Sequence, residues 1–308
     1  MSIQKVAIFG GSGNFGVPIV RALLDAGFAV TVITRHTSTA TISSDVSVVR
    51  TDYSAGELVK ALAGHDAAIC AVGPGGMWLQ SAMIDAAEAA KVKRFILGDF
   101  GWGKHVRSFP EFDEVHALRA AGWDHAAALA EANPAFTWTG ITTGNPIDWA
   151  LRKFPIMGFD IACQSAIIYD SGAEYFTGTT LEGIGQAVVG VLQNPDETRN
   201  RFVKVMSIKT CQSELLEAFE SVTESKWDVR KSSTETLLDS GRAKHRAGTG
   251  GWILELVVTQ LFQKGESRSQ VAATREDTDS DLLGVKTESA RDVVTRALEA
   301  YGLLQARS

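Results

Sequence analysis

The chain has 308 residues, of which 45% are hydrophobic and 21% are charged, and its formal net charge is -6. These proportions fit a globular enzyme of one or two domains, and the negative charge argues against the clustered positive field that nucleic-acid binding needs. No apolar run reaches the roughly 18 to 20 residues of a membrane-spanning helix, and the N-terminus lacks a secretory layout, so we expect a cytoplasmic protein with no nucleic-acid or membrane partner.

The first half of the chain alternates strand-like and helix-like segments. Near-continuous apolar strands separated by helices are typical of a parallel sheet that is covered on both faces. Strands are predicted at residues 3–9, 28–33, 46–49, 67–72, 94–97 and 136–141, and helices at residues 15–26, 57–63, 79–90 and about 112–132. We therefore expect an α/β fold whose first domain, residues 1–145, is a Rossmann-type, doubly wound parallel sheet.

The alternation stops after about residue 145. Segments 166–169 and 173–177 flank Asp170-Ser171-Gly172 and predict a hairpin. Further helices are predicted at residues 181–192, 211–222, 252–262 and 290–301, and an exposed polar loop at residues 264–280. This pattern predicts a smaller mixed α+β lobe over residues 146–308, which binds the substrate and is interleaved with the end of the sheet.

A glycine-rich loop lies between the first predicted strand and the first predicted helix. Gly10 permits a tight turn, Gly13 lets the backbone approach a pyrophosphate, and Gly16 allows the helix to pack close to the strand. The N-terminus of the helix then offers free N–H groups to the phosphates. The residues predicted to bind the cofactor here are Gly10, Ser12, Gly13, Asn14, Phe15 and Gly16.

The second predicted strand ends at Arg35, at the position where NAD-specific folds carry an acid for the ribose 2′-hydroxyl. No Asp or Glu occurs between residues 29 and 44. A guanidinium can instead hold a 2′-phosphate with two hydrogen bonds, so NADP(H) is the predicted cofactor. Gly73 and Pro74 end another strand and are predicted to pass close to it, and Phe100 is predicted to approach the nicotinamide.

These segments together resemble the isoflavone reductase-like and NmrA-like family of atypical short-chain dehydrogenases, in particular its fungal members. The resemblance implies an NADPH-dependent reductase of an aromatic or polyketide-like small molecule of secondary metabolism, and it implicates Gln80 near the cofactor. Some relatives act as cofactor-sensing regulators without turnover, and this remains an alternative. The segments that carry the resemblance are GGSGNFG at 10–16, TR at 34–35, GHDA at 64–67, VKRFI at 92–96, GDFG at 98–101, FTWTG at 136–140 and FTGTTL at 176–181.

The proton donor is less clearly marked than the cofactor loop. No tyrosine is followed by a lysine at the fourth residue, so the Tyr-x-x-x-Lys pair of ordinary short-chain dehydrogenases is absent. The family's lysine in the helix after the Phe-Gly loop is missing too. His116 and Lys104 are the predicted catalytic residues, because a histidine transfers protons at neutral pH, and His125 and His105 are further candidates.

Aromatic side chains are predicted to line the substrate pocket, with about half of them in the core. Those considered are Phe100, Trp102, Trp149, Phe154, Phe159 and Trp252. The residues predicted to contact the substrate are Trp102, Asn145, Asp148 and Trp149. The three cysteines form no ligand pattern, so no metal is predicted. A non-redox dehydratase or isomerase remains a third reading, and the chain is expected to be a monomer or a homodimer.

Overall fold

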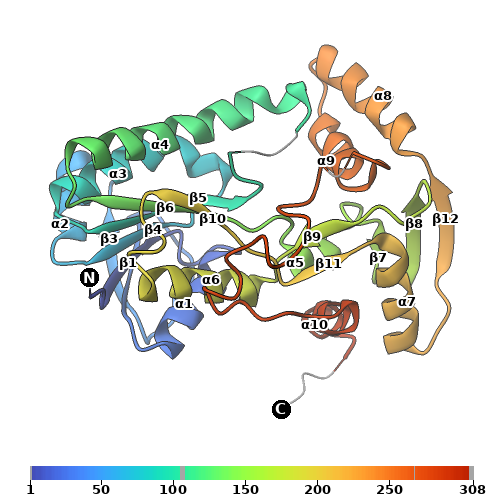
Figure 1. Ribbon diagram of the computed structural model, residues 1–308, viewed down its shortest axis with the longest axis horizontal. Helices are drawn as coiled ribbons and strands as arrows, with labels where there is room; N and C mark the ends of the chain where they lie inside the picture. Colours follow the sequence, from blue (N-terminus) through green and yellow to red (C-terminus); the bar gives the residue numbers. More distant parts are fainter. Residues whose placement is uncertain (1, 105–107, 267, 305–308) are drawn as a thin grey trace.

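The structure is a computed structural model that describes residues 2–104, 108–266 and 268–304. Figure 1 shows a large sheet between two layers of helices, with a smaller lobe of short strands and helices beside it. The strands of the large sheet run in the order β10-β6-β5-β4-β1-β2-β3, and all neighbouring pairs are parallel. Their bounds are Lys5–Phe9 (β1), Ala29–Arg35 (β2), Ser47–Thr51 (β3), Ala67–Cys70 (β4), Arg94–Gly101 (β5), Thr137–Thr142 (β6) and Arg201–Lys204 (β10).

The strand order reverses between β1 and β4, which makes this pair the switch point of a doubly wound sheet. Crevices at the carboxyl ends of the strands on either side of such a point are where α/β folds bind their ligands. The predicted Rossmann-type sheet is confirmed. The carboxyl edge of β1, β2, β4 and β5 is therefore where the site has to be sought.

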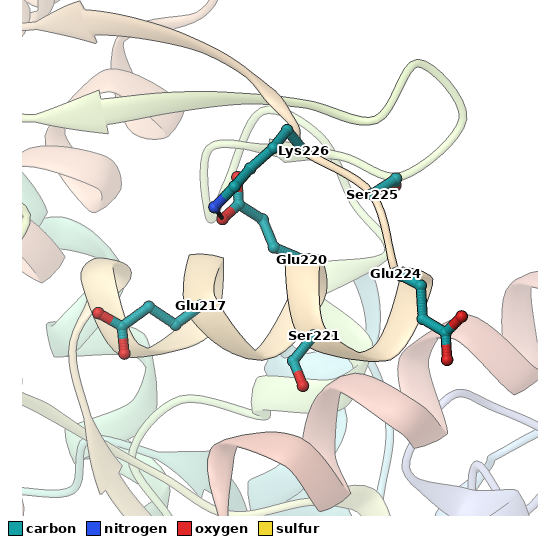
Figure 2. Close-up of a pocket in the computed structure, with 6 residues that line it drawn as sticks. All are labelled: Glu217, Glu220, Ser221, Glu224, Ser225 and Lys226. Atoms are coloured by element: carbon teal, nitrogen blue, oxygen red, sulfur yellow. Dashed lines mark hydrogen bonds and ion pairs between the residues drawn. The ribbon is translucent and has the colours of Figure 1, made fainter.

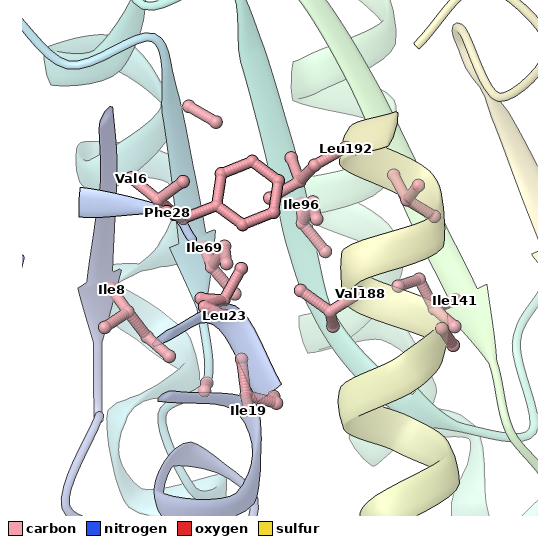
Figure 3. Packing of buried hydrophobic residues seen from close by; sticks show 14 of the residues in the cluster. Val6, Ile8, Ile19, Leu23, Phe28, Ile69, Ile96, Ile141, Val188 and Leu192 are labelled. Atoms are coloured by element: carbon pink, nitrogen blue, oxygen red, sulfur yellow. The ribbon is translucent and has the colours of Figure 1, made fainter. Parts of the chain in front are cut away.

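Alternating side chains of β1 enter two different cores. Val6 and Ile8 pack with α1 and α6, whereas Ala7 and Phe9 pack with α2, α3 and α4. Because successive side chains of a strand point to opposite faces, one apolar run can bury both faces. Figure 3 shows the first of these cores. The helices are α1 (Gly16–Asp25), α2 (Ala55–Leu62), α3 (Gln80–Ala89), α4 (Asp113–Ala132) and α6 (Leu181–Gln193).

The smaller lobe has its own core. Phe159 and Phe219 lie with ring centroids 5.0 Å apart, and Trp227 packs 4.5 Å from Phe219. Two small sheets and five helices surround this cluster in the described part of the chain. Their bounds are Ile147–Leu151 (α5), Phe159–Asp160 (β7), Ser165–Tyr169 (β8), Phe176–Gly178 (β9), Ile208–Thr210 (β11), Gln212–Thr223 (α7), Asp228–Ser232 (β12), Thr234–Arg246 (α8), Trp252–Phe262 (α9) and Ala290–Tyr301 (α10). Short 3-10 helices lie at Pro74–Leu79 (η1) and Pro110–Phe112 (η2).

The predicted hairpin around Asp170 is wrong. β8 pairs with β7 and β12, whereas β9 pairs with β11 in another sheet. The place beside the end of β8 is taken by β12, because the amide of Asp170 donates to Ser232 O at 2.9 Å. The Asp170 carboxylate then accepts the amide of Thr234 at 3.0 Å at the start of α8. This hydrogen bond fixes the turn after β8, so the residues that follow β8 leave it instead of folding back beside it.

Residues beyond 145 also contribute to the large sheet, although the strand and helix pattern was expected to stop there and only an interleaving with the end of the sheet was predicted. α6 covers the sheet beside α1, and β10 extends it beyond β6. Arg94 of β5 ties these parts together. Its buried guanidinium donates to Thr139 of β6 and to Thr198 before β10, each at 2.9 Å.

The polar segment 264–280 was predicted to be an exposed loop. Its described part is a loop without helix or strand, but it is only partly exposed. Ser269, Val271 and Ser280 are buried in it. The amide of Val271 donates to Thr177 Oγ1 at 2.9 Å, which attaches the segment to β9. Polar composition therefore did not mean exposure, because side-chain oxygens of the lobe receive the backbone of this segment.

Candidate active site

The glycine loop has backbone geometry that only glycine fits. Gly10 has a φ of +76°, and a Cβ atom there would lie 2.5 Å from the carbonyl oxygen of Ala71. A Cβ atom on Gly16 would collide with the carbonyl oxygen of Gly10. The amide of Gly13 donates to that same oxygen at 2.9 Å and closes the turn. The loop is therefore a compact cradle whose inner surface consists of main chain.

The start of α1 fits a phosphate group. No side chain caps the helix, and no acidic residue occurs in its first turn. The first amides of a helix have no intrahelical partner, and they carry a partial positive charge. Ser12 is half-buried beside these amides, and Asn14 is exposed. Here Val17 N donates to Gly13 O at 3.0 Å and Pro18 has no N–H, so it is the cradle together with the positive end of the helix that suits the pyrophosphate of a dinucleotide.

Arg35 lies at the end of β2 with its side chain exposed. Arg50 of the neighbouring strand donates to Ser38 O at 2.9 Å and to Arg35 O at 3.4 Å, which holds the turn that follows β2. The arginine side chains thus place positive charge at the carboxyl edge of β2 and β3. Burial raises the pKa of the nearby Tyr53 to about 12, although the charge of Arg35 opposes this shift.

The carboxyl ends of the neighbouring strands close the other side of the loop. The rings of Phe15 and Phe100 stack with their centroids 6.0 Å apart, so the structure brings the glycine loop and the end of β5 together. Gly73 and Pro74 are exposed at the start of η1, after β4. These positions surround one edge of the sheet, as expected for residues near a bound dinucleotide.

Gln80 is buried under this edge. Its Oε1 accepts the amide of Gly98 at 2.6 Å, and a Cβ atom on Gly122 of α4 would run into its Nε2. The side chain therefore lies between β5 and α4 and supports the strand. Contact of Gln80 with the cofactor, which the resemblance implied, stays a prediction.

Asp99 is the most perturbed carboxyl at this edge. The pairing of β5 with β6 shifts register between Ile96 and Phe100, which is an irregularity that re-aims side chains. Asp99 sits inside it and is 2% exposed. Burial raises the pKa of its carboxyl to about 6, against the lowering effects of Arg119 and of a backbone hydrogen bond from Gly103.

Arg119 faces Asp99 from α4, with its Nη1 3.8 Å from Asp99 Oδ1. The sequence analysis did not single out this arginine. The available signal was its spacing from His116, because residues three apart in a helix share one face. The structure thus places a cation beside the buried carboxyl, about one helical turn from His116.

The predicted proton donors differ in their surroundings. His116 is half-buried and lies edge-on to Phe112, with centroids 6.4 Å apart. Burial, and then the charge of Arg119, lower its pKa, so its imidazole is neutral at pH 7. Lys104 lies on the surface with its Nζ 3.6 Å from Asp124 Oδ1.

The remaining histidine candidates have less support as proton donors. His125 Nε2 lies 2.5 Å from Asp85 Oδ1, so this ring is engaged between α4 and α3. His105 falls outside the residues that the structure describes. His116 is consequently the described histidine that lies closest in the helix to the Asp99–Arg119 pair.

The predicted substrate residues fall into two groups. Asn145 and Asp148 are buried and serve the fold: Asn145 Nδ2 contacts the sulfur of Met157 at 3.0 Å, and Asp148 Oδ1 accepts the first amide of α6, at Leu181. Trp102 and Trp149 are partly buried against the core of the smaller lobe. The tryptophans therefore fit a pocket wall better than the buried polar pair does.

The other aromatic residues differ in their exposure. Phe159 is buried, and Phe154 is exposed. Trp252 packs against Phe112 of η2 and His245 of α8, with ring centroids 5.7 and 4.6 Å away. These contacts join the smaller lobe to the segment that precedes α4.

A pocket on α7 has a different character. Figure 2 shows its lining residues on the second half of the helix and just beyond it, where Glu220 points to Lys226, whereas Glu217 and Glu224 point away from this lysine. Lys226 Nζ lies 2.6 Å from Glu220 Oε2, so the single lysine is already paired. This acidic pocket does not suit a dinucleotide phosphate.

The described residues contain no group of three His, Cys, Asp or Glu side chains that could hold a metal ion. Among the helices they form, none is both long and apolar enough to cross a bilayer.

Comparison with known proteins agrees with this geometry. A family model described as NAD(P)H-binding matches residues 10–160. Oxidoreductase poxI of Penicillium oxalicum is 60% identical over 288 residues, which cover 94% of this chain and 92% of poxI. Oxidoreductase aprR of Aspergillus flavus is 32% identical over 237 residues, which cover 73% of this chain and 76% of aprR.

Solved structures give the fold. Isoflavone reductase superposes with a TM-score of 0.74 at 19% identity, covering 96% of this chain and 99% of that protein. The structure described as AtPrR2 with NADP+ and (+)pinoresinol superposes with a TM-score of 0.73 at 17% identity, covering 96% and 98%. The chain therefore belongs to the NAD(P)H-binding family of oxidoreductases and has the fold of isoflavone reductase, the family that its sequence motifs resemble.

Proposed function

We propose that the protein is an NADPH-dependent reductase of an aromatic or polyketide-derived small molecule. The observation that carries the proposal is the edge of the sheet where the glycine cradle, Arg35 and the aromatic end of β5 meet. The printed descriptions of similar proteins support it. poxI and aprR are called oxidoreductases, and one solved neighbour holds NADP+ with the aromatic compound pinoresinol.

Arg35 selects NADP(H) in this proposal. Its exposed guanidinium lies at the end of β2, against which this fold places the adenosine ribose. The planar fork matches a 2′-phosphate with two charge-assisted hydrogen bonds. Arg50 supports it by holding the turn after β2 through Ser38 O. The glycine cradle and the positive end of α1 bind the pyrophosphate.

The reaction needs a hydride, which the reduced nicotinamide supplies when it is bound. Phe15 and Phe100 form the wall that orients the ring at the end of β5. Trp102 and Trp149 offer flat apolar surface to an aromatic substrate. They lie on the side of the smaller lobe, so the substrate binds between the lobe and the sheet.

The proton that completes the reduction comes from His116 or Lys104, or from a water that they hold. His116 is neutral at pH 7, so it can donate the proton on one nitrogen only while its other nitrogen takes up a replacement proton from water. Lys104 has to leave Asp124 before it can donate. His116 is the stronger of the two candidates for this reason.

The test is a screen of NADPH oxidation with aromatic ketones and enones, followed at the nicotinamide absorbance and by identification of the product. We expect oxidation coupled to one reduced product. Tight binding of NADPH with no oxidation across the panel and with a protein partner recovered would instead favour a cofactor-sensing regulator. A product formed without consumption of NADPH would favour a dehydratase or isomerase.

A further inference from the structure

Arg119 is a cation with unused hydrogen-bonding capacity at the substrate side of the proposed site. Its side chain is 30% exposed, and it projects from the middle of α4 toward the end of β5. Its nearest charged partner is Asp99, 3.8 Å away, which is beyond hydrogen-bond length. No hydrogen bond of its guanidinium to another described residue is found. Several donors of the planar fork therefore remain free for a ligand.

The surroundings fix where these donors lie. A Cβ atom on Gly101 would be 3.4 Å from Asp99 Oδ1 and 3.9 Å from Arg119 Nη1, so both groups lie directly over this glycine. Gly101 follows Phe100, whose ring stacks on the glycine loop, and precedes Trp102 of the proposed pocket wall. The guanidinium thus lies at the residue between Phe100 and Trp102, where the proposed function puts the nicotinamide ring and the substrate.

Asp99 is a poor competitor for this guanidinium. Its side chain is 1% exposed, and its Oδ2 is buried without a hydrogen-bond partner among the described residues. Because burial disfavours its charged form, the carboxyl neutralises Arg119 only in part. A carboxyl that cannot reach solvent does not touch a substrate. It can, however, hold the guanidinium on the side of the pocket.

We propose that Arg119 binds an anionic oxygen of the substrate, and that Asp99 is the positioning residue that holds Arg119 over Gly101. The proposal rests on the proposed function, and it narrows the substrate class to aromatic acids, with a carboxylate or an ionised phenol or enol as the recognised group. An arginine cannot supply a proton at neutral pH. Its role is to orient the acid and to balance its charge, while the proton comes from elsewhere.

The experiment measures binding to the full-length protein saturated with NADP+. The probes are matched pairs of aromatic acids and their neutral amides, namely benzoate, salicylate and 2-naphthoate, titrated by calorimetry. We expect the acid of at least one pair to bind about 10-fold or more tightly than its amide, as a charge-assisted hydrogen bond allows. A second pair, 4-nitrophenol above its pKa and its methyl ether, separates phenolate from carboxylate recognition.

Variants at Arg119 and a matched control locate the effect. Arg119→Met should abolish the preference for the acid while leaving the affinity for the amide and for NADPH unchanged, and Arg119→Lys should restore part of it. Arg199→Met is the control, because Arg199 lies at the amino ends of the strands, opposite to the carboxyl ends that form the site, and donates to Pro134 O. This variant should keep the full preference. An acid preference that survives in Arg119→Met overturns the inference.

The role of Asp99 is tested by the same measurement, the difference in affinity between the acid and its amide. Asp99→Ala should weaken the preference for the acid, because the guanidinium loses its support, and Asp99→Asn should restore it, because the amide fills the same space. Equal affinities of acid and amide in all wild-type pairs would refute the role of Arg119 even if NADPH reduces a neutral ketone. Conversely, an Arg119-dependent preference without NADPH turnover would leave this inference standing and refute the proposed reductase.

Discussion

The two halves of the candidate site are built from different parts of the chain. On the side of β1 and β2 the binding surface is main chain, shaped by Gly10 and Gly16 and by the start of α1. On the side of β5 and α4 it consists of side chains, with Asp99, Arg119 and His116 brought together from strand and helix. A main-chain surface accepts one kind of ligand, whereas a side-chain surface can change its chemistry by substitution. The cofactor is consequently marked in the sequence, and the substrate is not.

The largest expected effect on cofactor binding is in the main-chain half. Gly16→Ala should lower the affinity for NADPH by about 100-fold, because a Cβ atom meets the carbonyl oxygen of Gly10 and this overpacking falls at the upper end of the usual cost of about 1–3 kcal/mol. Gly56→Ala on α2 is the matched control. No atom lies within 4 Å of a Cβ there, so NADPH binding should not change. Titration of NADPH against both variants measures the two affinities. A normal affinity in Gly16→Ala would contradict the tight cradle.

The side-chain half should respond in turnover instead of in cofactor binding. His116→Ala should lower kcat by roughly 10²- to 10⁴-fold if the histidine transfers the proton, with the affinity for NADPH unchanged. Steady-state kinetics with a substrate found in the screen, beside direct titration of NADPH, separates these quantities. An unaltered kcat would remove His116 from the mechanism and direct attention to Lys104.

Asp99 gives the side-chain half a pH signature in stability. Its pKa is raised from 3.8 to about 6 in the folded chain. A raised carboxyl pKa stabilises the fold below about pH 4, and that stabilisation is lost as the pH rises through 6. Asp99→Asn lacks this loss, so its unfolding free energy relative to wild type should increase by about 2 kcal/mol between pH 4 and pH 7. Denaturant unfolding at both pH values measures it, and a difference that does not depend on pH would mean that the pKa of Asp99 is the same in the folded and the unfolded chain.

The smallest expected effect is at Arg35. This residue lies at the outer end of the main-chain half, where a side chain determines which cofactor binds. Arg35→Ala removes a charge-assisted hydrogen bond of roughly 1.5–3 kcal/mol, so NADPH should bind about 10- to 150-fold more weakly and NADH almost as before. Arg35→Glu should shift the relative affinity further from NADPH toward NADH. Titrating both cofactors checks this. Equal losses for NADPH and NADH would indicate a folding defect, and no loss for either would show that Arg35 points away from the ribose.

The sequence predicted those elements whose patterns are local. The apolar strands around Phe9 and Ile69 and the glycine spacing depend on neighbouring residues, so the first strands, their helices and the cradle were placed correctly. β12 reads Asp228–Ser232 and is exposed throughout, and α8 has few apolar residues, so neither has a pattern to detect. β10 is only four residues long and was missed for a related reason.

The candidate site follows the same division. Predicted residues of the glycine loop and Phe100 are neighbours in space, because a turn and a strand end determine where they lie. Asn145 and Asp148 also follow a strand end, yet their side chains turn into the protein to serve Met157 and α6. Which way a polar side chain turns depends on partners far away in sequence, and Arg119 opposite Asp99 was missed for that reason.

The buried guanidinium of Arg94 has a consequence for how the chain folds as it is synthesised. Its partners Thr139 and Thr198 lie 45 and 104 residues further along the chain. Until the later partner has left the ribosome, β6 remains an open edge and the cation has no complete set of acceptors. An unpaired buried charge is strongly disfavoured. The nascent large sheet should therefore stay loosely packed at this edge until about residue 204 has emerged, and shorter fragments should be the ones that chaperones and proteases capture.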